Sequence, residues 1–199
     1  MKQFIAAEFD IPALKGISQK SIDEHLKLYA GYVKHANLIL EHIGELAKDS
    51  EKYAFELGEL QRRFSFEFNG MRNHESYFRS FTGGHVLPSE VSDLTKAVVE
   101  EWGAFEDWLN RFKAIALTRG IGWAMLYYDP VTKRPVNAWV DEQHLGQLNG
   151  CSPILALDMW EHSYVFDYQP SGKKKYVEDF FENLNWTVIE QNFTDASRA

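Results

Sequence analysis

Two long segments with helical spacing of apolar residues dominate the first part of the chain. The first runs over about residues 18–45 and the second over about residues 50–81. Apolar residues that recur every three or four positions are typical of amphipathic helices. Ser21 followed by Glu24 offers a capping box at the start of the first helix. Because only a short polar link joins the segments, we expect an antiparallel helical hairpin.

The pattern of apolar residues changes after Gly83 and Gly84, which can terminate the second helix in a left-handed conformation. Helical spacing returns in two shorter runs between residues 88 and 119. Residues 121–129 and 134–140 are rich in β-branched and aromatic side chains and flank a turn with a proline, which predicts a β-hairpin.

Residues 152–158 form a short, continuous apolar run, which is typical of a buried strand. Residues 176–186 have the pattern of one closing helix. We therefore predict an α+β fold in two domains, with a long antiparallel helical hairpin at residues 1–86. An α/β domain with a three-stranded antiparallel sheet follows at residues 87–199.

The charge and cysteine content exclude several classes of protein. The 199 residues include 29 acidic and 21 basic side chains, for a net charge of −8, and a single cysteine. An acidic surface disfavours nucleic acid and anionic membranes as partners, because neutralising phosphates needs clustered Lys and Arg. One cysteine cannot build a disulfide framework. We see neither a signal peptide nor a run approaching the roughly 20 apolar residues of a membrane span, and we expect a cytoplasmic protein.

Two histidines are predicted on the inner faces of the long helices. At about 100° per residue, His25 shares one face of the first helix with Tyr32. His74 shares a face of the second helix with Phe78 and with Gly70, whose missing side chain leaves room beside the imidazole. A glycine inside a helix costs roughly 1 kcal/mol relative to alanine. Taken singly, each histidine also fits a core residue hydrogen-bonded to a carbonyl.

The segment that ends the third predicted strand adds a carboxylate and a third imidazole. Asp158 terminates the apolar run, and His162 follows four residues later. An ionised carboxylate in a buried position is costly unless it is paired or bound to a metal. A hydrogen bond between the two that caps a following helix is the alternative. Three imidazoles and one carboxylate together suit iron, manganese or zinc, and do not suit calcium or magnesium.

Five motifs in one order make the sequence similar to the iron/manganese superoxide dismutase family over nearly the whole chain. The most specific is D-x-W-E-H at Asp158–His162. The others are H-x-K-L-Y-x-G-Y-V at His25–Val33, N-H-x-x-Y-F at Asn73–Phe78, G-x-G-W at Gly120–Trp123 and F-x-N-x-N-W at Phe181–Trp186.

The resemblance implies one iron or manganese ion per subunit, held between the two domains. The residues that match the family's metal ligands are His25, His74, Asp158 and His162. Tyr32 matches the tyrosine near the substrate channel, and Trp123 and Trp160 match aromatic walls of the pocket. Glu161 matches a glutamate that reaches across a dimer to a ligand histidine of the other subunit.

A further role in the family is a hydrogen bond to the solvent at the metal, made by a Gln or His. One of the two family positions for that residue is Gly70 here, so the role falls to the region after the second predicted strand. We choose His144 over Gln143 for it.

The chain departs from the family pattern at two places. It has one residue fewer between the first ligand and the tyrosine, so a gapless alignment would make Glu24 the ligand. We choose His25, because it shares a helix face with Tyr32 and because a second carboxylate would change the charge at the metal. The histidine and the aromatic residue that meet at the family's channel mouth are both missing, at Leu28/Tyr29 and at Val165.

The activity implied is dismutation of superoxide by a homodimer or tetramer. Because superoxide is an anion and the chain is acidic, a local positive field must guide it, and we expect Lys173, Lys174 and Lys175 near the funnel. One alternative is another non-haem iron enzyme that uses two histidines and a carboxylate, for which His25 would be dispensable. The other is a catalytically silent relative that serves as a dimeric binding protein.

Overall fold

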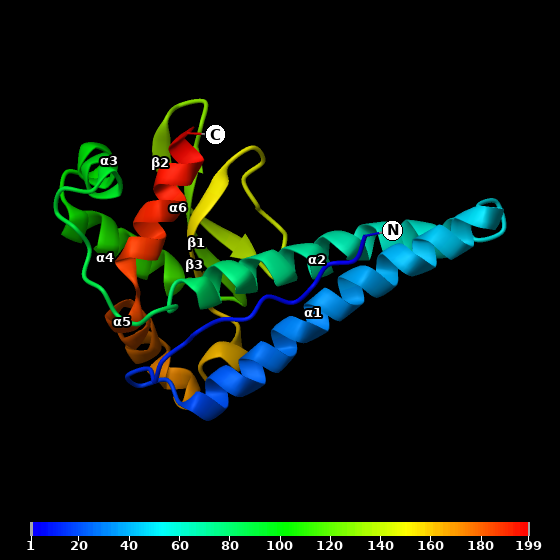
Figure 1. The fold of residues 1–199 in the computed structure, drawn as a ribbon, viewed down its shortest axis with the longest axis horizontal. Coiled ribbons are helices and arrows are strands. Elements are labelled where there is room, and N and C mark those ends of the chain that lie inside the picture. Colours follow the sequence, from blue (N-terminus) through cyan, green and yellow to red (C-terminus); the bar gives the residue numbers. More distant parts are fainter. Residues whose placement is uncertain (1, 199) are drawn as a thin grey trace.

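The first part of the chain forms the long helical hairpin that the sequence predicts. The structure is a computed structural model that describes residues 2–198. Helix α1 (Gln19–Leu46) and helix α2 (Ala54–Arg79) run antiparallel, with the short 3₁₀ turn η1 (Ala47–Asp49) between them. The 28 residues of α1 span about 42 Å, so the end of the hairpin projects beyond the rest of the molecule (Figure 1). Among the described residues, no helix combines the length and apolarity needed to cross a bilayer.

The start of α1 differs from the prediction. Ser18 is the N-cap, and its hydroxyl accepts a hydrogen bond from the Ser21 backbone N–H at 3.2 Å. The predicted capping box at Ser21 and Glu24 is wrong, because Ser21 already lies inside the helix and is buried. Glu24 instead accepts a hydrogen bond from the exposed Lys27 at 2.8 Å.

The second part confirms the predicted α+β fold and its three-stranded antiparallel sheet. The strands lie in the order β2-β1-β3. The bounds are α3 (Asp93–Trp102), α4 (Phe105–Ala116), β1 (Gly122–Asp129), β2 (Arg134–Asp141), β3 (Ser152–Asp158), η2 (Glu161–Ser163), η3 (Pro170–Gly172), α5 (Lys173–Asn183) and α6 (Trp186–Arg198). The predicted domain boundary after residue 86 lies in the segment that connects α2 to α3.

The single closing helix of the prediction is in fact two helices, α5 and α6. The chain turns between them because Leu184 adopts an extended conformation. The Asn185 backbone N–H donates to the Ser80 carbonyl at 2.7 Å, and the Asn185 side chain accepts from the Thr187 N–H. These bonds tie the break to the end of α2.

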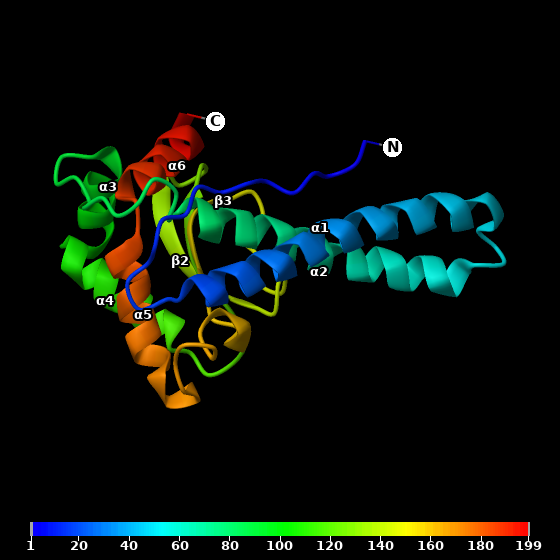
Figure 2. The ribbon, with the colours of Figure 1, turned by 60° about the horizontal axis from the view of Figure 1, so that its bottom comes forward.

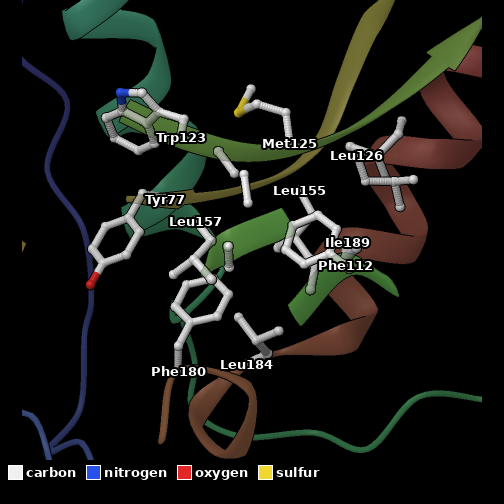
Figure 3. Packing of buried hydrophobic residues seen from close by; sticks show 14 of the residues in the cluster. Tyr77, Phe112, Trp123, Met125, Leu126, Leu155, Leu157, Phe180, Leu184 and Ile189 are labelled. Carbon is white, nitrogen blue, oxygen red and sulfur yellow. The ribbon is translucent and has the colours of Figure 1, made fainter. Parts of the chain in front are cut away.

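The hydrophobic core fills the space between the sheet and the helices around it. Figure 3 shows Trp123 on β1 and Leu157 on β3 facing Tyr77 from α2, Phe180 from α5 and Leu184 from the link between α5 and α6, and all five are completely buried. Burial of large aromatic and aliphatic side chains is the main favourable term in folding. The core therefore fixes the ends of β1 and β3 against the hairpin.

Strand pairing brings together the residues at one end of the sheet, where a site can form. Trp123 on β1 lies opposite Asp158 on β3 and Val140 on β2. A Cβ atom on Gly122 would come within 2.1 Å of the Val140 carbonyl oxygen. Only glycine allows the strands to approach this closely here. The G-x-G-W motif thus keeps Trp123 in register with Asp158.

An extended N-terminal arm runs along the hairpin, which Figures 1 and 2 show as the blue trace beside α1 and α2. The Ala7 backbone N–H donates to the Tyr29 hydroxyl at 2.8 Å. That hydroxyl in turn donates to the buried Glu75 carboxylate at 3.1 Å. The arm therefore braces the two helices at the level of the site.

Candidate metal centre

Four polar side chains converge where the hairpin meets the sheet. His25 comes from α1, His74 from α2, Asp158 from the end of β3 and His162 from η2. One possible ligand atom of each lies within 4.8 Å of the other three. The Nε2 atoms of His25, His74 and His162 lie 3.2, 3.5 and 3.1 Å from the same Asp158 Oδ2 atom. Three imidazole nitrogens thus face one carboxylate oxygen.

These separations fit four donors around a single ion. Metals of this type hold histidine nitrogen and carboxylate oxygen at about 2.0–2.2 Å. Two such donors at a right angle then lie about 3 Å apart, close to the measured values. The donor set is also right for iron, manganese or zinc, because imidazole with a single carboxylate is too poor in oxygen for calcium or magnesium.

His74 carries the most specific sign that a cation belongs here. Its Nδ1 atom lies 2.6 Å from the Gly70 carbonyl oxygen, an acceptor, so Nδ1 carries the proton and Nε2 presents a lone pair. Nε2 is buried and has no hydrogen-bond partner among the described residues. Burial, reinforced by the neighbouring His25, lowers the pKa of His74 to about 3, so the ring is neutral.

That lone pair faces an ionised carboxylate, since Asp158 Oδ2 lies 3.5 Å from His74 Nε2. Burial would raise the pKa of Asp158, but the charges and hydrogen bonds of His162 and His25 outweigh it and lower that pKa overall. A nitrogen lone pair that faces a carboxylate oxygen in a dry interior is unfavourable unless a positive ion lies between them. The four residues therefore fit a bound metal ion.

The structure distinguishes the two residues that compete for the first ligand position. His25 is buried in the cluster, and burial lowers the pKa of its imidazole despite the opposing effect of Asp158. Glu24 is exposed and bonded to Lys27. The residue that this chain lacks relative to the family pattern is therefore missing between His25 and Tyr32, both of which face the same interior.

A second group of residues, joined by hydrogen bonds, packs against the cluster. We call Tyr32, Trp123 and Gln143 the inner wall. Gln143 is completely buried, its amide Nε2 donates to the Tyr32 hydroxyl at 3.0 Å, and its Oε1 accepts from Trp123 Nε1 at 2.9 Å. The rings of Tyr32 and Trp123 each lie 5.0 Å from the His74 ring, measured between centroids.

The prediction that favoured His144 over Gln143 does not match this geometry. His144 is only half-buried and packs edge-to-face on Phe66, with 5.6 Å between ring centroids. Its Nδ1 atom has no partner among the described residues. Gln143 occupies the inward position because the backbone at Glu142 adopts a positive φ of 51° and turns the next side chain inward. Sequence patterning gives no signal for such a turn.

Gly70 does leave room beside His74, and Tyr32 fills it. A Cβ atom on Gly70 would lie 2.5 Å from Tyr32 Cδ1, too close for any real side chain. The glycine therefore allows the tyrosine ring to lie against the imidazole. Burial raises the pKa of Tyr32, and the nearby Asp158 charge raises it further, so the phenol stays protonated.

The opposite side of the cluster is exposed, and we call Leu28, Glu161, Val165 and Phe166 the outer wall. They line a hollow of about 610 Å³ together with Glu24, His25 and His162. The three apolar members are 36%, 41% and 54% exposed for Leu28, Val165 and Phe166. This is where the family's histidine and aromatic residue are missing.

Trp160 lies beside the metal-site cluster, whereas the lysines predicted near the funnel bond to residues outside it. Trp160 packs 5.8 Å from the His162 ring and donates to the Glu142 carbonyl at 3.0 Å. Lys173 instead donates to the Thr118 carbonyl at 3.0 Å, and Lys175 pairs with Asp179.

A separate hollow of about 380 Å³ leads to Tyr32 and Trp160. The basic groups in its lining are Lys27, His35 and Arg63, and none of the three predicted lysines is among them.

Sequence reasoning gave no role to several residues that support the cluster. The Tyr176 and Ser163 hydroxyls both donate to the Asp158 carbonyl, at 2.9 and 3.0 Å. The Asn73 side chain donates to the Gln143 carbonyl at 3.0 Å. The position of Asn73 directly before a ligand histidine was a usable signal, whereas the hydroxyl donors have no distinctive spacing.

The fold and the cluster fit the class of proteins that hold a single transition-metal ion between a helical hairpin and a small antiparallel sheet. Comparison with known proteins narrows that class. A family described as "Iron/manganese superoxide dismutases, C-terminal domain" matches residues 90–192. The chain belongs to the iron/manganese superoxide dismutase family.

Individual relatives span most of the chain. The iron superoxide dismutase of Cupriavidus metallidurans is 37% identical over 188 residues, which cover 93% of this chain and 92% of that protein. The iron superoxide dismutase of Tetrahymena pyriformis is 33% identical over 177 residues, covering 86% and 89%. The mitochondrial manganese superoxide dismutase of Glossina morsitans morsitans is 30% identical over 193 residues, covering 95% and 87%. Relatives of both metal types therefore align with it.

Proposed function

We propose that this protein is a superoxide dismutase that uses one iron or manganese ion per subunit. The reaction converts two superoxide anions and two protons into dioxygen and hydrogen peroxide. The observation that carries the proposal is the convergence of three Nε2 atoms on Asp158 Oδ2, with the His74 lone pair otherwise unpartnered. The choice of reaction rests on membership of the iron/manganese superoxide dismutase family.

The metal would be held by His25, His74, Asp158 and His162, and when bound it supplies alternate acceptance and donation of one electron. The chain's own residues shape what surrounds it. Hydrogen bonds behind Asp158 and His74 fix their orientation, which tunes the basicity of the ligands. The two tryptophans exclude bulk water, so that polar groups act in a medium of low dielectric constant.

Tyr32 is placed to handle a proton. Its oxygen accepts a hydrogen bond from the Gln143 amide, so its own O–H is free to donate. Because burial and Asp158 raise its pKa, the phenol keeps this proton throughout the neutral range. We assign Tyr32 Oη as the donor nearest the reacting oxygen species, and the Gln143 amide as the group that holds it there.

The test is to purify the protein, quantify its metal and follow superoxide decay by stopped-flow spectroscopy. We expect decay far faster than with the same concentration of free iron or manganese, after reloading with at least one of the two. A stoichiometrically loaded protein with no activity above free metal would contradict the proposal.

We further propose that two copies of the chain associate through the outer wall. The exposed apolar side chains of Leu28, Val165 and Phe166 line one hollow together with Glu24 and Glu161. A contiguous apolar patch rimmed by charge is typical of an interaction surface, and a second copy would bring its own Glu161 close to this site. Light scattering of the purified protein should give twice the chain mass or a multiple of it, and a monomer would exclude the proposal.

A further inference from the structure

Three side chains form a clamp at the backbone of Gln143, in which Asn73 and Gln147 bond to its carbonyl and Tyr127 orients Gln147. The Gln143 carbonyl accepts N–H donors from Asn73 at 3.0 Å and from Gln147 at 3.3 Å. Gln147 Nε2 also donates to Asn73 Oδ1 at 3.1 Å. The Tyr127 hydroxyl donates to Gln147 Oε1, which fixes the orientation of that amide.

The segment that carries Gln143 needs such support. Glu142 has a φ of 51°, a left-handed conformation that costs roughly 1–2 kcal/mol for a residue with a side chain. The segment is a tight loop, because the Asp141 and Leu145 backbones exchange hydrogen bonds at 2.8 and 3.1 Å. An inward glutamine on a strained loop keeps one position only if its surroundings over-determine it.

We propose that Gln147, oriented by Tyr127, is a positioning residue for the reaction, a proposal that rests on the proposed function. It holds the Gln143 backbone so that the side-chain amide spans Tyr32 Oη and Trp123 Nε1. Among the described residues, no hydrogen bond joins Gln147 to any of the four ligands. It acts only through Gln143. By positioning the Gln143 amide, it sets the direction of the Tyr32 hydroxyl indirectly.

The location of Gln147 makes the idea testable without disturbing the ligand cluster. Gln147 and Tyr127 line a surface hollow of about 570 Å³, whose wall also includes Asn69. The Asn69 amide donates only to the Ser65 carbonyl of its own helix, at 2.7 Å. Asn69→Ala is therefore a matched control, since it removes an amide from the same hollow but from outside the clamp.

The main experiment compares Gln147→Ala with Asn69→Ala in fully metal-loaded protein. We expect Gln147→Ala to lower kcat about tenfold, at the lower end of the effect of residues that orient a metal's surroundings, with metal content unchanged. Asn69→Ala should keep the wild-type kcat. Tyr127→Phe keeps the two hydrogen bonds that Gln147 donates and removes only the one that orients its amide. We therefore expect kcat to fall about twofold.

A double-mutant cycle separates positioning from general destabilisation. If Gln147 acts through Gln143, adding Gln147→Ala to Gln143→Ala should lower kcat no further. Independent, multiplicative losses in the double variant would overturn the proposal. Should Gln147→Ala fail to fold, Tyr127→Phe with Gln143→Ala gives the same cycle.

A spectroscopic measurement keeps the inference distinct from the proposed function. The absorption and EPR spectra of the bound metal report its surroundings whether or not superoxide is consumed. We expect Gln147→Ala to shift these spectra in the direction that Gln143→Ala shifts them, and Asn69→Ala to leave them unchanged. Wild-type spectra in Gln147→Ala would exclude a positioning role, even in a protein that proved to lack dismutase activity.

Discussion

On its inner side the ligand cluster is bounded by hydrogen bonds within the chain, whereas on its outer side it is bounded by exposed side chains. Gln143 joins Tyr32 to Trp123 in the inner wall, and all three are buried. Glu161 and the apolar residues of the outer wall face solvent around a hollow. Under the two proposals above, the difference teaches that one chain completes the proton-handling side of the site and leaves the other side for a second copy of the chain.

The largest effect should come from breaking the cluster that both walls enclose. We expect His25→Ala to lose its metal on dialysis and to lower activity more than the roughly 10–100-fold seen when a residue behind a ligand is replaced. Elemental analysis and superoxide decay measure both quantities.

Glu24→Ala is the control for that variant, because its side chain is exposed at the neighbouring position. It should retain metal and activity. If Glu24→Ala lost the metal and His25→Ala kept it, the ligand assignment would be reversed. If both kept it, a two-histidine, one-carboxylate site would be favoured.

The next prediction concerns Gly70→Ala, which tests how tightly the inner wall is packed. In Gly70→Ala, the new methyl group collides with the Tyr32 ring, and overpacking costs about 1–3 kcal/mol, partly offset by the roughly 1 kcal/mol that alanine gains in a helix. We expect a net fall in the free energy of unfolding of up to about 2 kcal/mol, measured by urea denaturation, together with reduced activity.

Gly58→Ala in the same helix is the control, since nothing lies within 4 Å of its Cβ position. It should raise the free energy of unfolding by about 0.5–1 kcal/mol. Equal stabilisation by both substitutions would show that Tyr32 does not occupy the space beside Gly70.

A smaller effect concerns the outer wall. Phe166→Ser replaces an exposed aromatic ring at the proposed contact between copies and should raise the dissociation constant of the dimer about tenfold, or about 1.4 kcal/mol. Sedimentation at several protein concentrations measures it. Val131→Ser, in the exposed turn between β1 and β2, should not change association. Unaltered association in Phe166→Ser would place the interface elsewhere.

A final effect, confined to alkaline pH, concerns Tyr127, whose hydroxyl donates to Gln147 behind the inner wall. Burial raises the pKa of Tyr127 above its ordinary value near 10. Above pH 10 the unfolded chain therefore binds fewer protons at this residue than the folded one, and stability falls as pH rises. Unfolding curves of wild type and Tyr127→Phe between pH 9 and 11.5 should differ in slope by up to about 1.4 kcal/mol per pH unit. Parallel curves would mean that Tyr127 titrates normally.

The cluster was predictable because each member has a signal in the sequence. His25 and His74 fall on apolar helix faces, Asp158 ends an apolar run, and His162 ends the D-x-W-E-H motif. The strands were predictable for the same reason. Placing four such groups together required only that the hairpin pack on the sheet.

The features that escaped prediction depend on backbone conformation and on distant contacts. The inward turn at Glu142 selects Gln143 over His144 without any change in periodicity. Ser18 rather than Ser21 caps α1, and the Ser18 backbone N–H is itself held by the Asp167 carboxylate at 2.8 Å, from far along the chain. The lysines of α5 are similarly fixed by Thr118 and Asp179, which the sequence does not place beside them.

The distribution of the four ligands along the chain has a consequence for the order of folding. His25 and Asp158 are separated by 133 residues, so the two halves of the site meet only after a long loop has closed, which is a slow step. A growing chain that has completed only the hairpin carries two imidazoles and no carboxylate partner. Under the proposed function, the complete set of four ligands therefore forms only once β3 has docked, so the metal would bind a nearly folded protein rather than a flexible peptide.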